Sequence, residues 1–287
     1  FVIVIGGGAV LDTVGFAAAI AHRGVRLIRF PTTVLAQCDS GVGVKNGINA
    51  FGKKNYLGVF TPPFAVVNDE RFLEGLTDRD WLSGFSEKVK VACIKDRAFF
   101  DRIRQNAAAI RKRDMVASVP IIERSAEIHM RHITDGSPGV AADPFEMTTA
   151  RPLDFGHWAA HKMEQMTNFR LRHGEAVSVG LALDVVYSRL VGMLDESECD
   201  AVLQCLTDLG LPTYDDALEY TDDLLRGLAE FREHLGGQLT ITLIDRIGHG
   251  VDVHEMDDEL IREAIAQLAR RSEKKVTTEA RRHGEMR

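Results

Sequence analysis

The stretch FVIVIGGGAVLDTVGFAAAIAH, residues 1–22, decides the fold class. A strand-like apolar run over residues 1–5 leads directly into three glycines, and a helical stretch follows over residues 12–22. A strand that enters a glycine turn and then a helix is typical of a nucleotide-binding βαβ unit. Two more short apolar runs follow, at 25–30 and 64–68. Residues 1–77 are therefore predicted to be an α/β domain of the Rossmann-like type.

From residue 78 onward the apolar spacing changes to three and four, as in Trp81, Phe85 and Val89. This spacing is typical of packed amphipathic helices, so residues 78–271 are predicted to form a second, mostly helical domain. Within it we expect a loop at 134–143, a late strand at 239–244 and a last helix at 257–270. The polar residues 272–287 are expected to form a mobile tail.

The composition is that of an ordinary globular protein, with 45% hydrophobic and 27% charged residues in 287. A net charge of −7 gives no electrostatic footprint for nucleic acid or for an anionic membrane. The 4 cysteines contain no CxxC pair, which suits a reducing cytoplasm. No apolar run approaches the roughly 18 residues of a membrane span. We therefore expect a cytoplasmic protein that binds neither nucleic acid nor membrane.

Three histidines and one glutamate lie in distinctive segments: GFSEKVK with Glu87, DFGHWAAHKME with His157 and His161, and RHGEAVSVG with His173. His157 and His161 are four apart and would share one helix face. The HExxH metalloprotease motif needs a glutamate directly after the first histidine, and Trp158 takes that place here. The spacing alone fits a metal site, but it also fits a helix whose two histidines are merely hydrogen-bonded in the core or solvated.

These segments resemble the 3-dehydroquinate synthase superfamily of sugar phosphate cyclases, as do IGGGAVLDTVGFAAAIAHRGV, FPTTVLAQCDSGVGVKNGIN and FGKKNYLGVFTPPFAVVND upstream. The similarity runs from about residue 2 to 183 in the family's order, and several ordered motifs are more specific than any one of them. The resemblance implies a dehydroquinate synthase-like fold, with a truncated NAD-binding domain over 1–77 and a helical metal- and substrate-binding domain over 78–271. Because the family's domain has further strands upstream, its N-terminal part is expected to be missing from this sequence.

The resemblance also implies a metal site and a proton carrier. A divalent ion such as Zn²⁺ or Co²⁺ needs about three N/O ligands and one open position for catalysis. Glu87, His157 and His173 would supply those ligands, and His161 would then remain for proton transfer.

The three glycines would let the backbone approach the NAD pyrophosphate, with the following helix aimed at its charge. A tight structural turn would explain a lone GGG as well, but the neighbouring motifs favour NAD. The expected cofactor positions are Gly6, Gly7, Gly8, Asp12, Thr32, Thr33, Asp39, Ser40, Lys54 and Leu76. The expected catalytic positions besides His161 are Lys45, Lys90, Asp39 and Glu146. The expected substrate positions are Arg23, Lys45, Asn55, Lys90, His129 and Asp154. Lys53 and Lys88 are expected at the surface.

In such a family the reaction begins with transient oxidation of a substrate alcohol by NAD, assisted by the metal. Phosphate elimination, reduction, ring opening and an intramolecular aldol closure then give a carbocycle. The resemblance further suggests a homodimer, with Arg23 reaching the phosphate site of the neighbouring subunit.

The sequence departs from the 3-dehydroquinate synthases on the substrate side. Those enzymes hold the substrate carboxylate with a lysine, an arginine and an asparagine, where this chain has His129, Ala150 and Asp154, with Arg151 one place along. A carboxylate at Asp154 would repel the substrate's carboxylate. The segment DPFE, ending at Glu146, instead resembles branches that cyclise sugar phosphates without a carboxylate, such as sedoheptulose 7-phosphate.

The segment VGVKNGIN also departs from the usual VGGKT form, at Val44 and Asn46. As a whole the chain is similar to the synthase-like protein of the bacterial ebo gene cluster, an uncommon branch. We therefore expect a cyclase of a carboxylate-free sugar phosphate. A genuine 3-dehydroquinate synthase is the first alternative, and an NAD-dependent polyol dehydrogenase is an alternative of another class.

Overall fold

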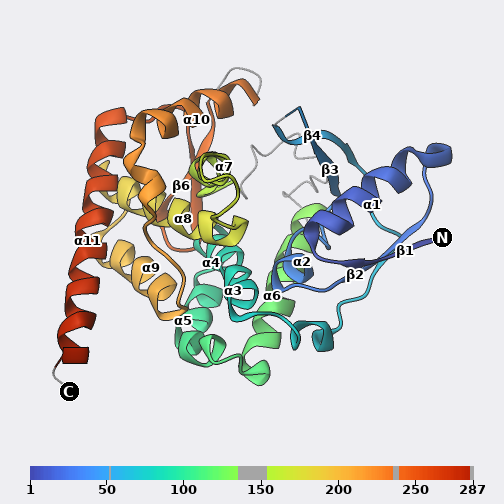
Figure 1. Ribbon diagram of the computed structural model, residues 1–287, viewed down its shortest axis with the longest axis horizontal. Coiled ribbons are helices and arrows are strands. Elements are labelled where there is room, and N and C mark those ends of the chain that lie inside the picture. Colours follow the sequence, from blue (N-terminus) through green and yellow to red (C-terminus); the bar gives the residue numbers. More distant parts are fainter. Residues whose placement is uncertain (52, 135–153, 235–238, 285–287) are drawn as a thin grey trace. The chain divides into compact units, whose positions relative to one another are not determined.

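The computed structural model describes residues 1–51, 53–134, 154–234 and 239–284; for residues 53–54, 231–234 and 275–284 it describes the backbone alone (Figure 1). The chain forms two compact units. The first consists of Phe1–Lys88 and Ala108–Ala150, and the second of Val89–Ala107 and Arg151–Arg287. The chain thus enters the second unit, returns to the first and leaves it again. The domain limits expected from the sequence stay a prediction.

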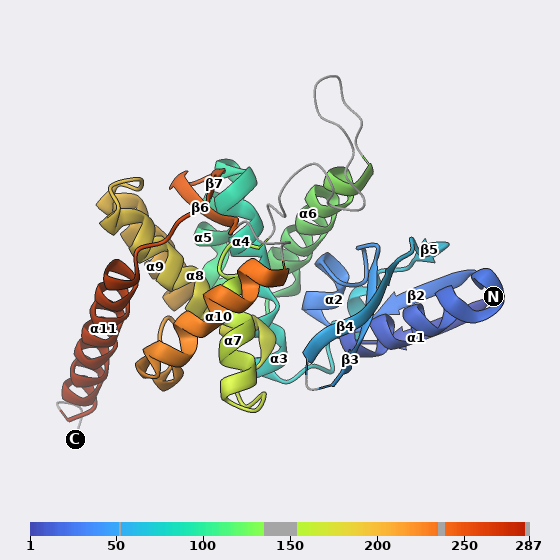
Figure 2. The same ribbon diagram turned by 90° about the horizontal axis from the view of Figure 1, so that it is seen from above.

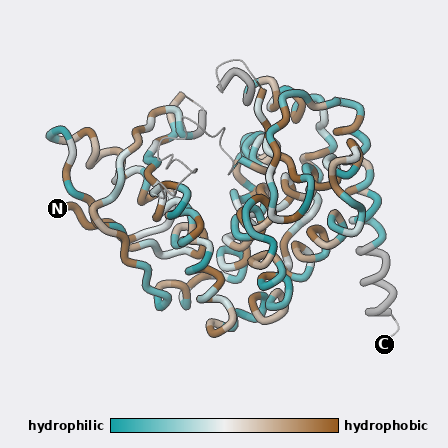
Figure 3. Tube along the Cα trace, turned by 180° about the vertical axis from the view of Figure 1, so that it is seen from behind, coloured by the Kyte–Doolittle hydropathy of each residue, from teal (hydrophilic) through white to brown (hydrophobic). Residues whose placement is uncertain are grey.

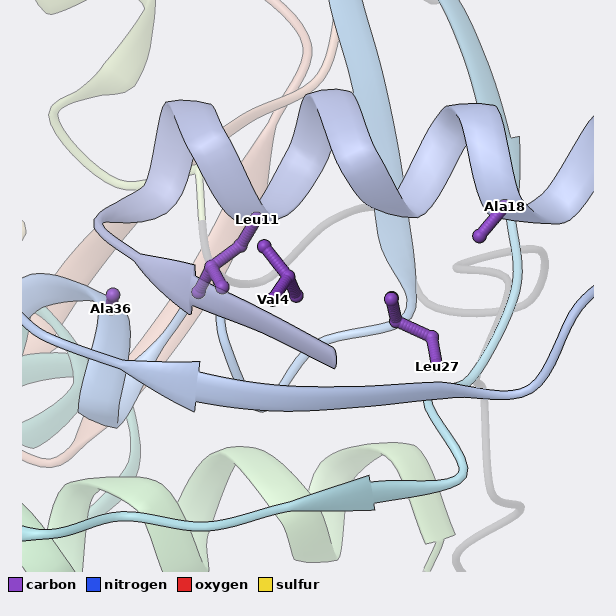
Figure 4. Packing of buried hydrophobic residues seen from close by; sticks show 5 residues of the cluster. All are labelled: Val4, Leu11, Ala18, Leu27 and Ala36. Carbon is purple, nitrogen blue, oxygen red and sulfur yellow. The ribbon is translucent and has the colours of Figure 1, made fainter. Parts of the chain in front are cut away.

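The first unit contains a parallel sheet in the order β1-β2-β5, made of β1 (Val2–Gly6), β2 (Leu27–Pro31) and β5 (Ala65–Val66). These are the three predicted apolar runs, and the α/β prediction is confirmed. The N-terminal strand is visibly hydrophobic in Figure 3. Helix α1 (Gly8–Ile20) covers one face of this sheet, and a small core lies between them (Figure 4). Its buried residues are Val4, Leu11, Ala18, Leu27 and Ala36.

The expected helix start at residue 12 is four residues late, because α1 begins at Gly8 directly after the strand. Gly7 caps it with extended backbone angles, φ −77° and ψ 178°. The remaining elements of this unit are a 3₁₀ turn (Ala21–Arg23), α2 (Val34–Cys38), the antiparallel hairpin β3 (Lys45–Ala50) and β4 (Lys53–Phe60), a 3₁₀ turn (Glu70–Leu73), α3 (Asp78–Ser83) and α6 (Met115–Thr134). The hairpin has no counterpart among the predicted elements.

Helices α4 (Phe85–Lys95) and α5 (Arg97–Arg111) connect the two units. The second unit continues with α7 (His157–Met166), α8 (His173–Leu190), α9 (Glu196–Asp208), a 3₁₀ turn (Asp216–Glu219), α10 (Thr221–His234), the hairpin β6 (Ile241–Arg246) and β7 (His249–Val253), and α11 (Asp258–Gly284). The predicted helical character, the late strand and the last helix are all present. Helix α11 extends to Gly284, well past the expected end near residue 270.

Helix α8 is the centre of the second unit (Figure 2). Every residue from Ala176 to Ser188 is buried, and α7, α9, α11 and β6 all pack against this helix. A helix that is apolar on all sides belongs in a core. Among the described residues, no helix is both long and apolar enough to cross a membrane. The burial of α8 fixes the position of its N-terminal residue, His173, within this unit.

Candidate functional site

The glycine turn of the first unit lies against two other predicted cofactor segments. A Cβ atom added to Gly7 would lie 3.1 Å from Thr33 Cγ2, and one added to Gly8 would lie 2.8 Å from Ser40 Oγ. The Thr32 amide donates to the carbonyl of Gly6 at 3.0 Å. Thus the turn, the PTT segment and Ser40 meet at the N-terminus of α1, where backbone amides and the helix dipole favour an anion.

Asp39 follows α2 and contacts a residue predicted to bind substrate. Its Oδ1 lies 3.0 Å from Nδ1 of His129, which comes from α6 and is only 9% exposed. Nε2 of His129 faces Gly43, with 3.3 Å to a Cβ built there. The imidazole is therefore held by the loop that contains Asp39, and the structure joins two residues that the sequence assigned separately to cofactor and substrate.

Other predicted residues of this unit differ in exposure and backbone conformation. Arg23 and Lys45 are exposed, and Leu76 is half-buried. Arg23 and Asn55 have positive φ angles of 66° and 51°, a region that side-chain-bearing residues seldom adopt. The Asn55 amide donates to Asn49 Oδ1 at 2.9 Å. The Lys54 side chain and Glu146, together with Ala150 and Arg151, lie outside the described residues.

Helix α4 carries Glu87, Lys88 and Lys90, all of which are buried. The expectation that Lys88 lies at the surface is wrong, because its side chain is 0% exposed. Its Nζ donates to the carbonyl of Gly84 at 3.1 Å and lies 2.9 Å from Cys38 Sγ. The Gly84 carbonyl and the Cys38 thiol thus accept hydrogen bonds from the buried ammonium. The contact with Cys38 links α4 to the last residue of α2, which directly precedes Asp39.

Three histidines of the second unit form a cluster at the adjoining ends of α7 and α8. The ring centroids of His157 and His161 are 5.4 Å apart, those of His157 and His173 are 5.4 Å apart, and those of His161 and His173 are 5.9 Å apart. His157 is buried, while the other two are half-buried. The structure thus brings His173 together with the two histidines of a separate motif.

Hydrogen bonds at Nδ1 set the tautomers of two of these rings. Nδ1 of His157 lies 3.0 Å from the carbonyl of Phe155, and Nδ1 of His173 lies 3.1 Å from Oε2 of the buried Glu164. Carbonyl and carboxylate oxygens accept, so Nδ1 is the donor in both bonds. In the neutral form of each ring the lone pair then lies on Nε2, which is the tautomer found in many metal-binding imidazoles.

The N-terminus of α7 is anchored to α8 by a buried carboxylate. Asp184 accepts the Gly156 amide at 2.8 Å and the Trp158 indole N–H at 2.8 Å. Complete burial raises the pKa of Asp184 to about 7, although both hydrogen bonds lower it. The backbones also meet closely, because a Cβ on Gly180 would lie 2.0 Å from the Gly156 carbonyl oxygen. These contacts position His157, which stands between the two anchored residues.

The second unit also contains a competing ligand set, since His161, Glu164 and His173 offer ligand atoms within 4.8 Å of one another. Asp154 is half-buried, and its carbonyl accepts the His157 amide at 2.8 Å. The sequence interpretation missed Glu164 and Asp184. Glu164 had a signal: positions 157, 161 and 164 share a helix face at spacings of four and three. Asp184 had none, because its partners are an indole and a backbone amide distant in sequence.

The comparison with protein families gives matches over most of the chain. The 3-dehydroquinate synthase N-terminal family matches residues 1–83, and the 3-dehydroquinate synthase C-terminal family matches residues 84–229. A 3-dehydroquinate synthase of Ruegeria sp. is 35% identical over 272 residues, covering 93% of this chain and 71% of the relative. A 2-epi-5-epi-valiolone synthase of Streptomyces glaucescens is 34% identical over 270 residues, covering 93% and 68%.

A solved structure is similar over nearly the whole chain. It is the 2-epi-5-epi-valiolone synthase of Streptomyces hygroscopicus subsp. jinggangensis with NAD⁺ and Zn²⁺ bound. The TM-score is 0.87 at 31% identity, and the match covers 94% of this chain and 73% of that one. The dehydroquinate synthase-like fold expected from the sequence is thereby confirmed.

Proposed function

Because this chain belongs to the 3-dehydroquinate synthase family of sugar phosphate cyclases, we propose that it is an NAD- and divalent-metal-dependent cyclase whose substrate lacks a carboxylate, as sedoheptulose 7-phosphate does. It is an enzyme of the lyase type. The observation that carries the metal-dependent proposal is the cluster of His157, His161 and His173 with two Nε2 atoms prepared as ligands.

The donor set suits a borderline divalent ion. Two neutral imidazoles whose tautomers are fixed by hydrogen bonds at Nδ1 bind Zn²⁺ or Co²⁺ well. A carboxylate as third ligand leaves a position open for substrate. We assign that third position to Glu87, which is buried on the first turn of α4. The competing set of His161, Glu164 and His173 is less suited, because Glu164 already accepts from Nδ1 of His173.

The glycine turn suits the pyrophosphate of NAD, since α1 begins at Gly8 and its first turn faces Thr33 and Ser40. The related 2-epi-5-epi-valiolone synthase has NAD⁺ and Zn²⁺ bound. When bound here, the metal would lower the pKa of a substrate alcohol, and NAD would accept and return its hydride. The chain's own residues would then orient the sugar and move its protons.

His161 is assigned to proton transfer. It lies one helical turn after His157, with its ring 5.4 Å from that of His157 and 5.9 Å from that of His173. A half-buried imidazole at this place could carry a proton between a substrate oxygen and solvent without itself being a ligand. Lys45, Lys90 and Arg23 are assigned to the substrate phosphate, and Asn55 and Glu146 to its hydroxyls.

The preference for a substrate without a carboxylate rests on the residues that replace the expected cations. His129 is engaged by the Asp39 carboxylate at 3.0 Å, which makes it a poor counter-ion for another carboxylate. Asp154 adds a like charge. Loss of two charge-assisted hydrogen bonds at about 1.5 to 3 kcal/mol each corresponds to a factor of roughly 10² to 10⁴ or more in reactivity.

The test is a comparison of kcat/KM for sedoheptulose 7-phosphate and for the seven-carbon keto acid phosphate that 3-dehydroquinate synthases cyclise. Metal-loaded protein is incubated with NAD and each sugar, phosphate release is followed, and the product is identified by NMR. The proposal expects the carboxylate-free sugar to react at least about a hundredfold better. Preference for the keto acid would make the protein a 3-dehydroquinate synthase. Accumulation of NADH without phosphate release would make it a polyol dehydrogenase.

The metal assignment has a separate test. Glu87→Gln should lose metal, measured by elemental analysis after dialysis, whereas Glu175→Gln on α8 should retain it. Glu175 accepts the Arg172 amide at 2.9 Å and serves as a matched carboxylate that caps a helix. Metal retained in Glu87→Gln and lost in His161→Ala would instead support the competing set.

A further inference from the structure

A buried arginine lies beneath the loop that follows α2. Arg29, in the middle of β2, is 0% exposed. Its Nη1 donates to three carbonyls of this loop: Ser40 at 3.3 Å, Gly41 at 3.1 Å and Gly43 at 2.8 Å. Three carbonyls that converge on one guanidinium nitrogen hold a loop more firmly than its own turns do, because hydrogen bonds to a charged donor are the stronger ones.

The second guanidinium nitrogen binds Asn46, the residue at which VGVKNGIN departs from the VGGKT form. Nη2 of Arg29 donates to Oδ1 of Asn46. Nδ2 of Asn46 donates to the carbonyls of Val44 and Thr61, both at 3.0 Å. The side-chain amide of Asn46 thus joins Arg29 to Val44 in the last part of the loop and to Thr61, the residue after β4. A side chain without both an acceptor and two donors could not make these bonds.

Helix α1 has a gap that admits this pair. A Cβ built on Gly15 would lie 1.8 Å from Oδ1 of Asn46 and 3.3 Å from Nη2 of Arg29. Glycine is unfavourable inside a helix, so its presence at this contact follows from the space that the pair needs. Burial lowers the pKa of Arg29, and Asp12, one turn earlier on α1, partly offsets this lowering. An arginine stays charged in proteins, and here three carbonyls and the Asn46 side chain accept its hydrogen bonds.

We propose that Arg29 and Asn46 are a positioning pair that sets the conformation of the loop 39–45, and thereby the affinity for NAD. The loop contains Asp39 and Ser40, which are assigned to the cofactor, and ends at Lys45, which is assigned to the phosphate. Neither Arg29 nor Asn46 is assigned to a ligand, and both act through the loop. This inference rests on the proposed function for the assignment of the loop to NAD, but the contacts that define the pair do not.

Two measurements on Asn46→Ala and Arg29→Met test the pair. Hydrogen exchange reports on the loop directly, because the amides of Gly41, Val42 and Gly43 are hydrogen-bonded to the carbonyls of Ala36 and Asp39. Their exchange should accelerate by roughly tenfold or more, while exchange in α8 stays as in the wild type. The Kd for NAD, measured by titration calorimetry, should rise by about tenfold or more.

The control is Arg26→Met. Arg26 lies three residues before Arg29 and is exposed, with its guanidinium 5.6 Å from the ring centroid of Phe1 and 5.4 Å from that of Phe64. Its loss should leave both measurements unchanged. If Arg29→Met does not fold, Asn46→Ala decides alone, because it removes a neutral amide and leaves the arginine its three carbonyls.

The outcomes separate the two claims. Unchanged exchange in the loop, or faster exchange throughout the chain, overturns the positioning role. Faster exchange confined to the loop with an unchanged Kd for NAD shows that the pair holds the loop, but overturns its effect on the cofactor. A wild-type protein that binds no NAD contradicts the proposed function, and the exchange data still decide whether the pair holds the loop.

Discussion

Removal of the Glu164 carboxylate should weaken the metal site without removing a ligand. Glu164 is 4% exposed, and its Oε2 accepts from Nδ1 of His173 at 3.1 Å. This bond keeps the proton on Nδ1, orients the ring and makes Nε2 a better ligand. In Glu164→Gln the amide can turn its NH₂ group toward Nδ1, which favours the tautomer with the proton on Nε2 and blocks coordination.

The magnitude follows from the strength of such a bond. A hydrogen bond to a charged group in a buried place contributes about 1.5 to 3 kcal/mol, and loss of the partner of a metal-binding histidine typically costs 10- to 100-fold in affinity. We therefore expect the Kd for Zn²⁺ or Co²⁺ to rise by about 10- to 100-fold in Glu164→Gln. The assay is competition with a chromophoric chelator on protein first stripped of metal.

Glu175→Gln is the matched control for this experiment, because it removes the same charge from the first turn of the helix that begins at His173. Its hydrogen bond goes to the Arg172 amide, so the metal Kd should change by less than about threefold. Equal Kd values for Glu164→Gln and the wild type would refute the orienting role. Equal weakening of metal binding in both variants would mean that the loss of a negative charge, and not the orientation of His173, raises the Kd.

Three other expectations follow from the same unit. His161→Ala should retain metal and NAD but lower kcat by roughly a hundredfold or more, since it removes a proton carrier; unchanged turnover in a steady-state assay contradicts this role. Asp184 has a pKa of about 7 against 3.8 when unfolded, so the native state binds its proton more tightly and the free energy of unfolding should fall as pH rises from about 4 to 7. In urea unfolding, the free energy of unfolding of Asp184→Asn should therefore fall less with pH than that of the wild type. An identical pH dependence in the two proteins would contradict this prediction. Gly180→Ala would place Cβ 2.0 Å from the Gly156 carbonyl and should lower the free energy of unfolding by about 1 to 3 kcal/mol or more, whereas Gly75→Ala, with nothing within 4 Å, should cost little in the same denaturation assay.

The sequence predicted those parts of the fold that follow from local periodicity. The three strands of the parallel sheet are the three apolar runs, and a helix, α3, starts at Asp78 behind the cap Thr77, where the apolar spacing changes. The error of four residues at the start of α1 has a local cause. Glycine has low helix propensity, so Gly8 looked like part of the turn. In the structure Gly8 is nevertheless the first residue of the helix, and a Cβ atom built on it would lie 2.8 Å from Ser40 Oγ.

The hairpin of β3 and β4 was not foreseen because its strands contain glycine, asparagine and lysine, which are poor strand formers. Its pairing depends on contacts between residues distant in sequence. Among them is the hydrogen bond from the side-chain Nδ2 of Asn46 to the carbonyl of Thr61. Lys88 was misplaced for a related reason. Nothing in a sequence shows that a main-chain carbonyl and a thiol will be free to receive an ammonium at one buried point.

Residues of the candidate site differ in how visible they are in the sequence. Side chains expected to touch ligand, such as His157, His161 and His173, lie in motifs whose spacing is visible along the chain. The residues that position such side chains are determined by packing. Asp184 accepts an indole N–H and a backbone amide on either side of His157, and Arg29 donates to three carbonyls of the loop 39–45. Their partners are 11 to 28 residues away and are mostly main chain, so no pattern of residue types marks them. Buried ionisable groups whose hydrogen bonds go largely to backbone are therefore the place to look for supporting residues in this family once coordinates are available, because each costs desolvation that apolar packing would avoid.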